Sequence, residues 1–163
     1  YEEYYHYKCD HFVTSCTVGF FKNTPNKQIV VGSWDKSVRM LELENDDLIE
    51  NWKRDFEAPV IKVIKGDLTE VESNEIGVIL NNGESFILNG QNGETIFKTI
   101  ADKPILDGDI GKIDDSGKSY FICGGNDNIL YIYDENGTKI HEMELNNRIT
   151  SLKIGDLDGD TQN

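Results

Sequence analysis

Residues 29–42 read IVVGSWDKSVRMLE, with two apolar runs on either side of a polar turn. A similar pattern returns in residues 121–134, FICGGNDNILYIYD, and in shorter form in residues 77–88, GVILNNGESFIL. β-branched and aromatic residues favour strands, whereas Gly, Asn and Asp favour tight turns. Each segment therefore predicts two antiparallel strands joined by a short hairpin turn.

These hairpins belong to a longer internal repeat. Short apolar segments with a central glycine recur along the chain, and the glycines are 47, 45 and 44 residues apart: Gly19, Gly66, Gly111 and Gly155. A unit of ~45 residues with four short strands has the size of one β-propeller blade. The sequence thus predicts an all-β fold, a partial β-propeller of about three and a half four-stranded antiparallel blades.

The repeat phase gives the blade boundaries within one partial propeller domain, residues 1–163. We place three blades at residues 12–57, 58–103 and 104–147, followed by the start of a truncated blade at residues 148–163. The same phase assigns residues 46–56, the one candidate amphipathic helix, to an outer strand.

Residues 1–11 precede the first blade and have two interpretations. They can form a strand of a preceding blade, or an N-terminal arm that binds another protein, because tyrosine is enriched at interfaces. The aromatic residues behind both interpretations are Tyr1, Tyr4, Tyr5, Tyr7 and Phe12.

The composition argues against several partners. The 163 residues include 30 Asp and Glu against 16 Lys and Arg, for a formal net charge of −14. Nucleic acid and anionic lipid surfaces attract basic proteins, so neither is an expected partner. No apolar stretch approaches the ~20 residues that a membrane helix needs, and the first residues do not have the pattern of a signal peptide.

The three cysteines indicate the compartment. Cys9, Cys16 and Cys123 form no CxxC pair, and their odd number and wide spacing do not suggest a disulfide framework. Cys16 and Cys123 lie in apolar runs, which predicts that both are small core residues. A reducing compartment suits this usage, so we expect a cytoplasmic protein.

The hairpin at residues 31–39, VGSWDKSVR, resembles the second-to-third strand hairpin of Trp-Asp (WD) repeat propellers. The resemblance implies that the turn aspartate orients the hairpin by hydrogen bonding to backbone groups, and Asp35 and Asp127 match it. The Gly-His pair of that family is absent, and the closing Trp-Asp pair is replaced by Leu41-Glu42 and Tyr133-Asp134. The likeness is therefore to the superfamily.

Residues 154–160, IGDLDGD, resemble the FG-GAP loop of integrin-type propellers. The resemblance implies that Asp156, Asp158 and Asp160 can bind Ca²⁺, a cation that takes 6–8 oxygen ligands. Their other interpretation is an acidic turn in which Asp side chains accept hydrogen bonds from backbone amides.

Two further segments, residues 90–94 and 134–138, resemble the outer hairpins of quinoprotein-like propellers. The mixture of WD-like and FG-GAP-like blades is similar to the propellers of ciliary coat-complex (Bardet–Biedl type) subunits. That similarity implies a scaffold.

The sequence contains no recognisable catalytic motif. The histidines His6, His11 and His141 are scattered, no Ser or Cys lies in a nucleophile turn, and no glycine motif could hold a phosphate. We therefore expect a chain that is not an enzyme, with no catalytic residue, and no cofactor other than the Ca²⁺ considered above.

The leading hypothesis is a non-catalytic protein-interaction scaffold, because a propeller presents loops on a rigid core. The partners would be proteins, and the negative charge would steer basic ones. A Ca²⁺-binding extracellular adhesion or ligand-binding propeller of FG-GAP type is the alternative, and a quinoprotein-like enzyme is a remote one. An arc of blades leaves two raw edges, so we expect ring closure by homodimerisation or by further blades of a longer chain.

Overall fold

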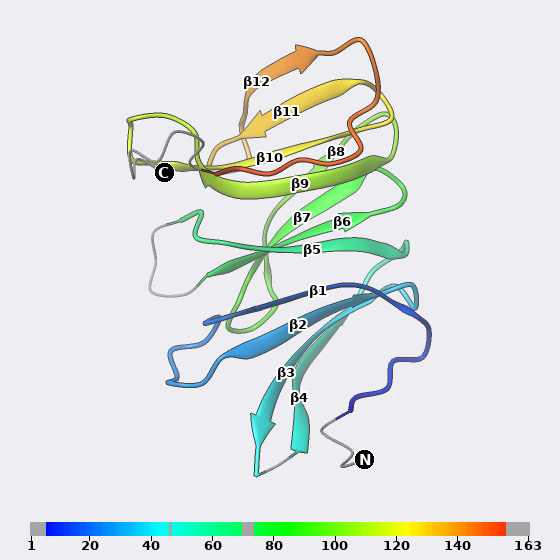
Figure 1. The fold of residues 1–163 in the computed structure, drawn as a ribbon, viewed down its shortest axis with the longest axis vertical. Helices are drawn as coiled ribbons and strands as arrows, with labels where there is room; N and C mark the ends of the chain where they lie inside the picture. The colour runs from blue at the N-terminus through cyan, green and yellow to red at the C-terminus, as the bar shows by residue number, and fades with distance from the viewer. Residues whose placement is uncertain (1–5, 46, 70–73, 156–163) are drawn as a thin grey trace.

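The computed structural model describes residues 6–45, 47–69 and 74–155, and these contain twelve strands and no helix (Figure 1). The strands form three separate four-stranded sheets, and within each sheet consecutive strands pair antiparallel. The first sheet contains β1 (Val13–Gly19), β2 (Gln28–Ser33), β3 (Ser37–Glu44) and β4 (Asp47–Asp55). The second contains β5 (Val60–Gly66), β6 (Glu75–Leu80), β7 (Glu84–Asn89) and β8 (Thr95–Ile100). The third contains β9 (Ile105–Lys112), β10 (Ser119–Gly125), β11 (Ile129–Tyr133) and β12 (Lys139–Glu144).

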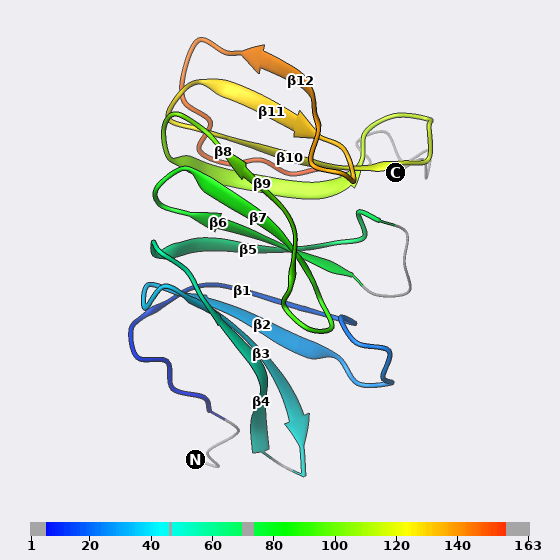
Figure 2. The same ribbon diagram turned by 180° about the vertical axis from the view of Figure 1, so that it is seen from behind.

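The sheets stack in chain order, and their first strands lie side by side. β1 contacts β5, and β5 contacts β9, as both ribbon views show (Figures 1 and 2). The predicted all-β architecture of four-stranded antiparallel units is confirmed. Residues 47–55 form the outer strand β4 and not a helix, as the repeat phase predicted.

The hydrophobic core is divided into two clusters, one at each junction between sheets. The first lies between the first and second sheets and includes Met40, Val78 and Leu88; the second lies between the second and third sheets and includes Ile79, Ile87 and Phe121. The second sheet therefore buries apolar side chains on both faces, against the first sheet on one side and the third sheet on the other.

Two Asn-Gly turns hold the outer strands against their neighbours. Gly93 and Gly137 have φ of 71° and 77°, a conformation that glycine adopts without steric cost. A Cβ atom on Gly93 would lie 3.0 Å from the Trp52 ring, and one on Gly137 would lie 2.6 Å from the Phe97 ring. Each glycine thus lets an aromatic side chain of the preceding sheet pack directly on the turn.

The described parts of the two end segments contain no strand. Residues 6–12 are irregular, and Tyr1, Tyr4 and Tyr5 lie outside the described residues, so both interpretations of residues 1–11 stay predictions. Residues 149–155 run beside β9 without forming a strand (Figure 1). Their path is set by side chains of β9, because the N–H groups of Leu152 and Ile154 donate to Asp107 and Asp109 at 2.8 and 2.9 Å.

The register shift inside the third sheet, where Gly125 of β10 pairs with Ile105 of β9, gives a test of the packing. A Cβ atom on Gly125 would lie 2.2 Å from the Pro104 carbonyl oxygen, and backbone there cannot move aside cheaply. Gly125→Ala is therefore expected to lower the free energy of unfolding by about 1–3 kcal/mol in urea denaturation. Gly155→Ala is the matched control, because a Cβ there meets no atom within 4 Å, and equal losses for the two variants would contradict this packing.

Candidate functional site

The acidic loop singled out in the sequence lies outside the described residues, which end at Gly155; the loop includes Asp156, Asp158 and Asp160. Within the described part of the chain, no three His, Cys, Asp or Glu side chains lie together as a metal site. Asp114, an acid in the loop between β9 and β10, is engaged by protein groups, accepting from Ser116 N at 3.0 Å and from Tyr120 Oη at 3.1 Å. These hydrogen bonds, the Ser116 bonds above all, hold the pKa of Asp114 below its ordinary value.

Three hairpin turns use the same side-chain hydrogen bond. Asp35 accepts from Ser37 N at 3.0 Å, and Asp127 accepts from Ile129 N at 3.1 Å. The second sheet uses an asparagine, because Asn82 Oδ1 accepts from Glu84 N at 3.1 Å. Asn82 was missed in the sequence, although its place in the repeat and its Asx character could have identified it.

Asp35 also binds a buried arginine, and this sets it apart from the other two turn residues. The Arg39 guanidinium donates to Asp35 at 2.8 Å, and the Arg39 side chain is only 4% exposed. Burial raises the pKa of Asp35, but hydrogen bonds from Ser37 and Arg39 outweigh it and leave the pKa below its ordinary value. Asp35 is therefore a charged anchor for Arg39 as well as a turn residue.

Arg39 lies on the outer face of the first sheet, away from the second sheet. It shares this face with its cross-strand neighbours Val31 and Lys53, while the adjacent row, which includes Met40, packs into the first core cluster. The N-terminal segment reaches the same face, because Asp10 lies 3.4 Å from Arg39.

Glu50 completes the charge cluster on this face. Its carboxylate lies 3.4 Å from Arg39 Nε and accepts a hydrogen bond from the Tyr7 hydroxyl, which raises the pKa of Tyr7. The outer face of the first sheet is thus polar at its centre, and residues 7–10 cover part of it.

The two cysteines expected in the core differ. Cys123 is buried in the second core cluster, and burial raises the pKa of its thiol. Cys16 is exposed, so the prediction for it was wrong. Cys16 pairs with Val31 on the outer face of the first sheet, where the described residues provide no second sheet to cover it.

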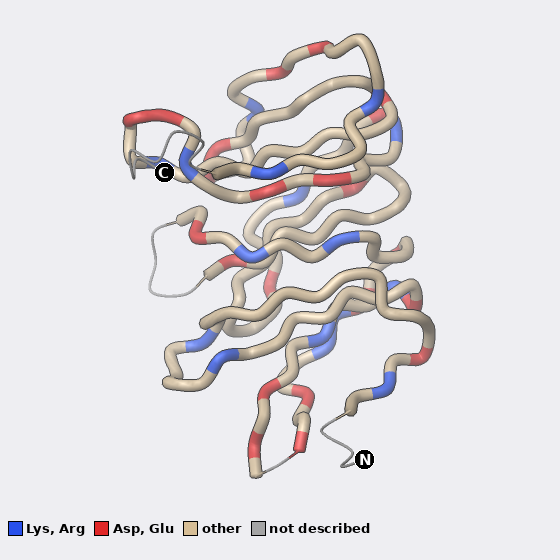
Figure 3. The backbone as a smooth tube through the Cα atoms, viewed as in Figure 1, with Lys and Arg blue, Asp and Glu red and all other residues tan. Residues whose placement is uncertain are grey.

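Carboxylates on β9 link the first strands of neighbouring units. Asp107 is buried, and it accepts from the Lys62 ammonium of β5 and from Leu152 N on the other side. Asp109 likewise lies 2.8 Å from Lys153 Nζ. Figure 3 shows basic positions on β5 beside acidic positions on β9. Side chains of β9, rather than a backbone ladder, therefore join this strand to β5 and to residues 152–154.

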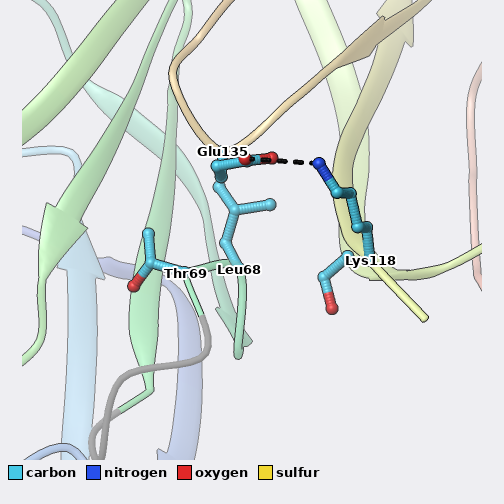
Figure 4. Close-up of a pocket in the computed structure, with 5 residues that line it drawn as sticks. Leu68, Thr69, Lys118 and Glu135 are labelled. Atoms are coloured by element: carbon cyan, nitrogen blue, oxygen red, sulfur yellow. Dashed lines mark ion pairs between the residues drawn. The ribbon is translucent and has the colours of Figure 1, made fainter. Parts of the chain in front are cut away.

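A small pocket opens between loops of the second and third sheets (Figure 4). It is lined by Leu68, Thr69, Lys118, Ser119 and Glu135, and Lys118 lies 3.7 Å from Glu135. Its volume of about 100 Å³ has room for a few water molecules, whereas pockets for organic ligands are typically ~300–1,000 Å³.

Stacked four-stranded antiparallel sheets with their first strands side by side define this chain as a partial β-propeller. Comparison with solved structures places it in the same class, because the matching chains BamB and BBS1N are β-propeller proteins. No protein-family model and no curated protein sequence matches the chain.

The matches share the fold at low sequence identity. BamB from Moraxella catarrhalis is 15% identical with a TM-score of 0.62, over 86% of this chain and 39% of BamB. BBS1N, solved in complex with ARL6DN after soaking with lead, is 14% identical with a TM-score of 0.70, over 90% of this chain and 44% of BBS1N. A second BBS1N–ARL6DN structure, soaked with mercury, is 13% identical with a TM-score of 0.68, over 86% and 40%. The chain thus spans less than half the length of these propellers.

The difference between the turn aspartates can be measured. Asp35→Asn keeps an acceptor for Ser37 N but removes the charge beside buried Arg39, so we expect a loss of about 2 kcal/mol or more in the free energy of unfolding. Asp127→Asn is the matched control and should cost about 1 kcal/mol or less, because Asp127 binds only neutral donors, Ile129 N and Tyr131 Oη. Equal losses in urea denaturation would show that Arg39 does not depend on Asp35.

Asp107 makes stability depend on acid pH. Burial raises the pKa of Asp107, but hydrogen bonds from Lys62, Leu152 and Gly108 outweigh it and hold the pKa below the ordinary 3.8. A depressed carboxyl pKa stabilises the fold fully above pH 3.8, and this contribution is lost as pH falls below that value toward the folded-state pKa. The destabilisation caused by Asp107→Asn, measured by thermal melting, should therefore be largest near neutral pH and shrink below about pH 4. A pH-independent difference would contradict this assignment.

Proposed function

We propose that this chain is part of a non-catalytic protein-interaction scaffold built on a β-propeller. The observation that carries the proposal is the pair of outer sheet faces at the two ends of the stack, on which the described residues leave several apolar side chains exposed. Rigid sheets that keep apolar side chains exposed provide surfaces for other protein elements. The BBS1N propeller, solved in complex with ARL6DN, supports this kind of role at the level of the fold.

The two outer faces have different chemistry. On the first sheet, Val18 is 51% exposed, on the same face as Cys16, which lies two residues earlier on β1. On the third sheet, Met143 is 48% exposed beside Leu130, its partner on β11. One end therefore offers a mixed polar and apolar face, and the other offers a mainly apolar one.

These faces also support ring closure. In a closed propeller each sheet packs on two neighbours, whereas the first and third sheets here each pack on one. We propose that the ring is completed by a second copy of the chain or by further blades of a longer chain. The lengths of BamB and BBS1N, of which this chain covers about two fifths, are compatible with either.

The net charge supports basic protein partners, and the free cysteines support a reducing compartment. The net charge of −14 favours basic protein partners through electrostatic steering. All three thiols are free and Cys16 is exposed, which suits a reducing compartment and supports our proposal of a cytoplasmic setting.

Multi-angle light scattering tests closure. We expect the purified chain to form dimers or larger species, because two sheet faces stay open in the monomer. Met143→Glu, which places a charge on the third-sheet face, should shift the protein toward the monomer, while Glu142→Gln on the opposite face of β12 is the control. A stable monodisperse monomer of 18.5 kDa would exclude homodimeric closure for this chain.

Native purification tests the scaffold itself. The protein should retain a basic partner protein in a fixed stoichiometry, and the association should weaken as salt is raised, because steering by net charge is screened. Failure to retain any partner at low salt, from cells that express the protein at its normal level, would contradict the proposal.

A further inference from the structure

The repeat makes the two junctions between sheets directly comparable. Lys36 O accepts from Phe56 N at 2.8 Å, and Gly83 O accepts from Ala101 N at 3.0 Å, so Phe56 and Ala101 are equivalent positions. Arg54 and Thr99, two residues earlier on the outer strands β4 and β8, are equivalent positions by the same register. The first junction therefore has an arginine and a phenylalanine where the second has a threonine and an alanine.

At the first junction these two side chains fill the outer part of the interface. Arg54 donates to Gly93 O and Thr95 Oγ1 of the second sheet, both at 2.6 Å. Its guanidinium lies 5.5 Å from the centroid of the Phe56 ring. The Phe56 ring in turn meets Phe86 edge-on, with centroids 5.1 Å apart, a favoured aromatic geometry.

At the second junction the same region is hollow. A depression of about 440 Å³, open to solvent, lies between β8 and the β11–β12 hairpin, and Thr99 and Ala101 line it. The facing wall includes Tyr131, which is equivalent to Phe86, and Tyr133. Phe97 packs on the Gly137 turn as Trp52 packs on Gly93. The second junction therefore lacks large side chains only at the positions equivalent to Arg54 and Phe56.

One buried side chain at this junction lacks the contact expected of it. Ser85 is the cross-strand partner of Thr99 and is 1% exposed, and its Oγ has no hydrogen-bond partner within the described part of the chain. A buried unpaired hydroxyl is unfavourable, and it marks this junction as incomplete by itself.

The charges around the hollow favour a basic guest. Lys98 lies over the Phe86 ring and pairs with Glu84, and Lys139 lies 2.5 Å from Glu142, so neither lysine leaves an unpaired positive charge at the hollow. Asp102, which also lines the hollow, forms no ion pair with any described residue. The uncompensated charge at the rim is therefore negative.

We propose that this hollow binds an extended segment of a partner protein that carries an arginine or lysine and an aromatic residue two positions later. The aromatic ring would pack beside Tyr131, as Phe56 packs beside Phe86, and the basic side chain would lie near Asp102. The proposal rests on the proposed scaffold function and assigns it one surface and one partner chemistry.

A peptide titration followed by NMR tests the proposal. The probe is acetyl-Arg-Ser-Phe-amide, with acetyl-Glu-Ser-Phe-amide and acetyl-Arg-Ser-Ala-amide as controls. We expect amide shifts confined to residues 98–102 and 129–139, with a Kd of about 1 mM, the range of a short peptide. Both control peptides should bind more weakly, because each lacks one of the two recognised groups.

Variants separate the hollow from the rest of the molecule. Ala101→Phe restores the first-junction residue and should abolish binding, while Asp102→Asn should weaken it about 2- to 5-fold. Thr99→Arg restores the other first-junction residue at a half-buried position, so it tests the hollow even where Ala101→Phe does not fold, and it too should weaken binding. Phe56→Ala, which opens the equivalent space at the first junction, should add a second set of shifts around Phe86.

Three results would overturn the proposal: no shifts at about ten times the expected Kd, shifts outside the hollow, or binding that survives both Ala101→Phe and Thr99→Arg. These results would leave the scaffold function intact, because the outer sheet faces are separate surfaces on which a partner can still be retained. Loss of partner retention with intact peptide binding would instead contradict the scaffold function alone.

Discussion

The structure depends on one constraint: the apolar face of a four-stranded sheet must be buried, and here the cover is the neighbouring sheet. The two core clusters meet this constraint at the two junctions, where Met40 and Phe121 are fully buried. No helix in the described residues covers a sheet face, and residues 7–10 cover only part of the outer face of the first sheet. The two ends of the stack therefore determine which further protein elements can bind, because each end sheet has one face without a neighbouring sheet.

The sequence predicted the architecture because local signals and the repeat agreed. Alternating apolar runs and Asx or Asn-Gly turns marked the hairpins, and the repeat phase correctly made residues 47–55 an outer strand although Trp52 and its neighbours could also fit a helical face. Cys16 was misjudged because an apolar run does not reveal which face of a strand has a neighbour. The buried anchors Asp107 and Asp109 were not foreseen, because their partners are about 45 residues away and include backbone N–H groups, which carry no sequence signature.

The candidate binding surface could be found only by comparing copies of the repeat in three dimensions. Thr99 and Ala101 are unremarkable outer-strand residues in the sequence. They gain meaning because Arg54 and Phe56 occupy the same places one unit earlier and fill the space that Thr99 and Ala101 leave open. In a repeat fold, the common residues specify the framework, and the differences between copies create individual surfaces.

The side-chain links between first strands have an evolutionary consequence. The three sheets share no backbone hydrogen-bond ladder, and β5 is joined to β9 through the Lys62–Asp107 pair and apolar packing. Duplication or deletion of one whole unit of the gene would therefore leave every remaining ladder intact and disturb only side-chain contacts at one junction. Such a chain can change its number of blades in single steps, and each new junction can then diverge toward its own partner.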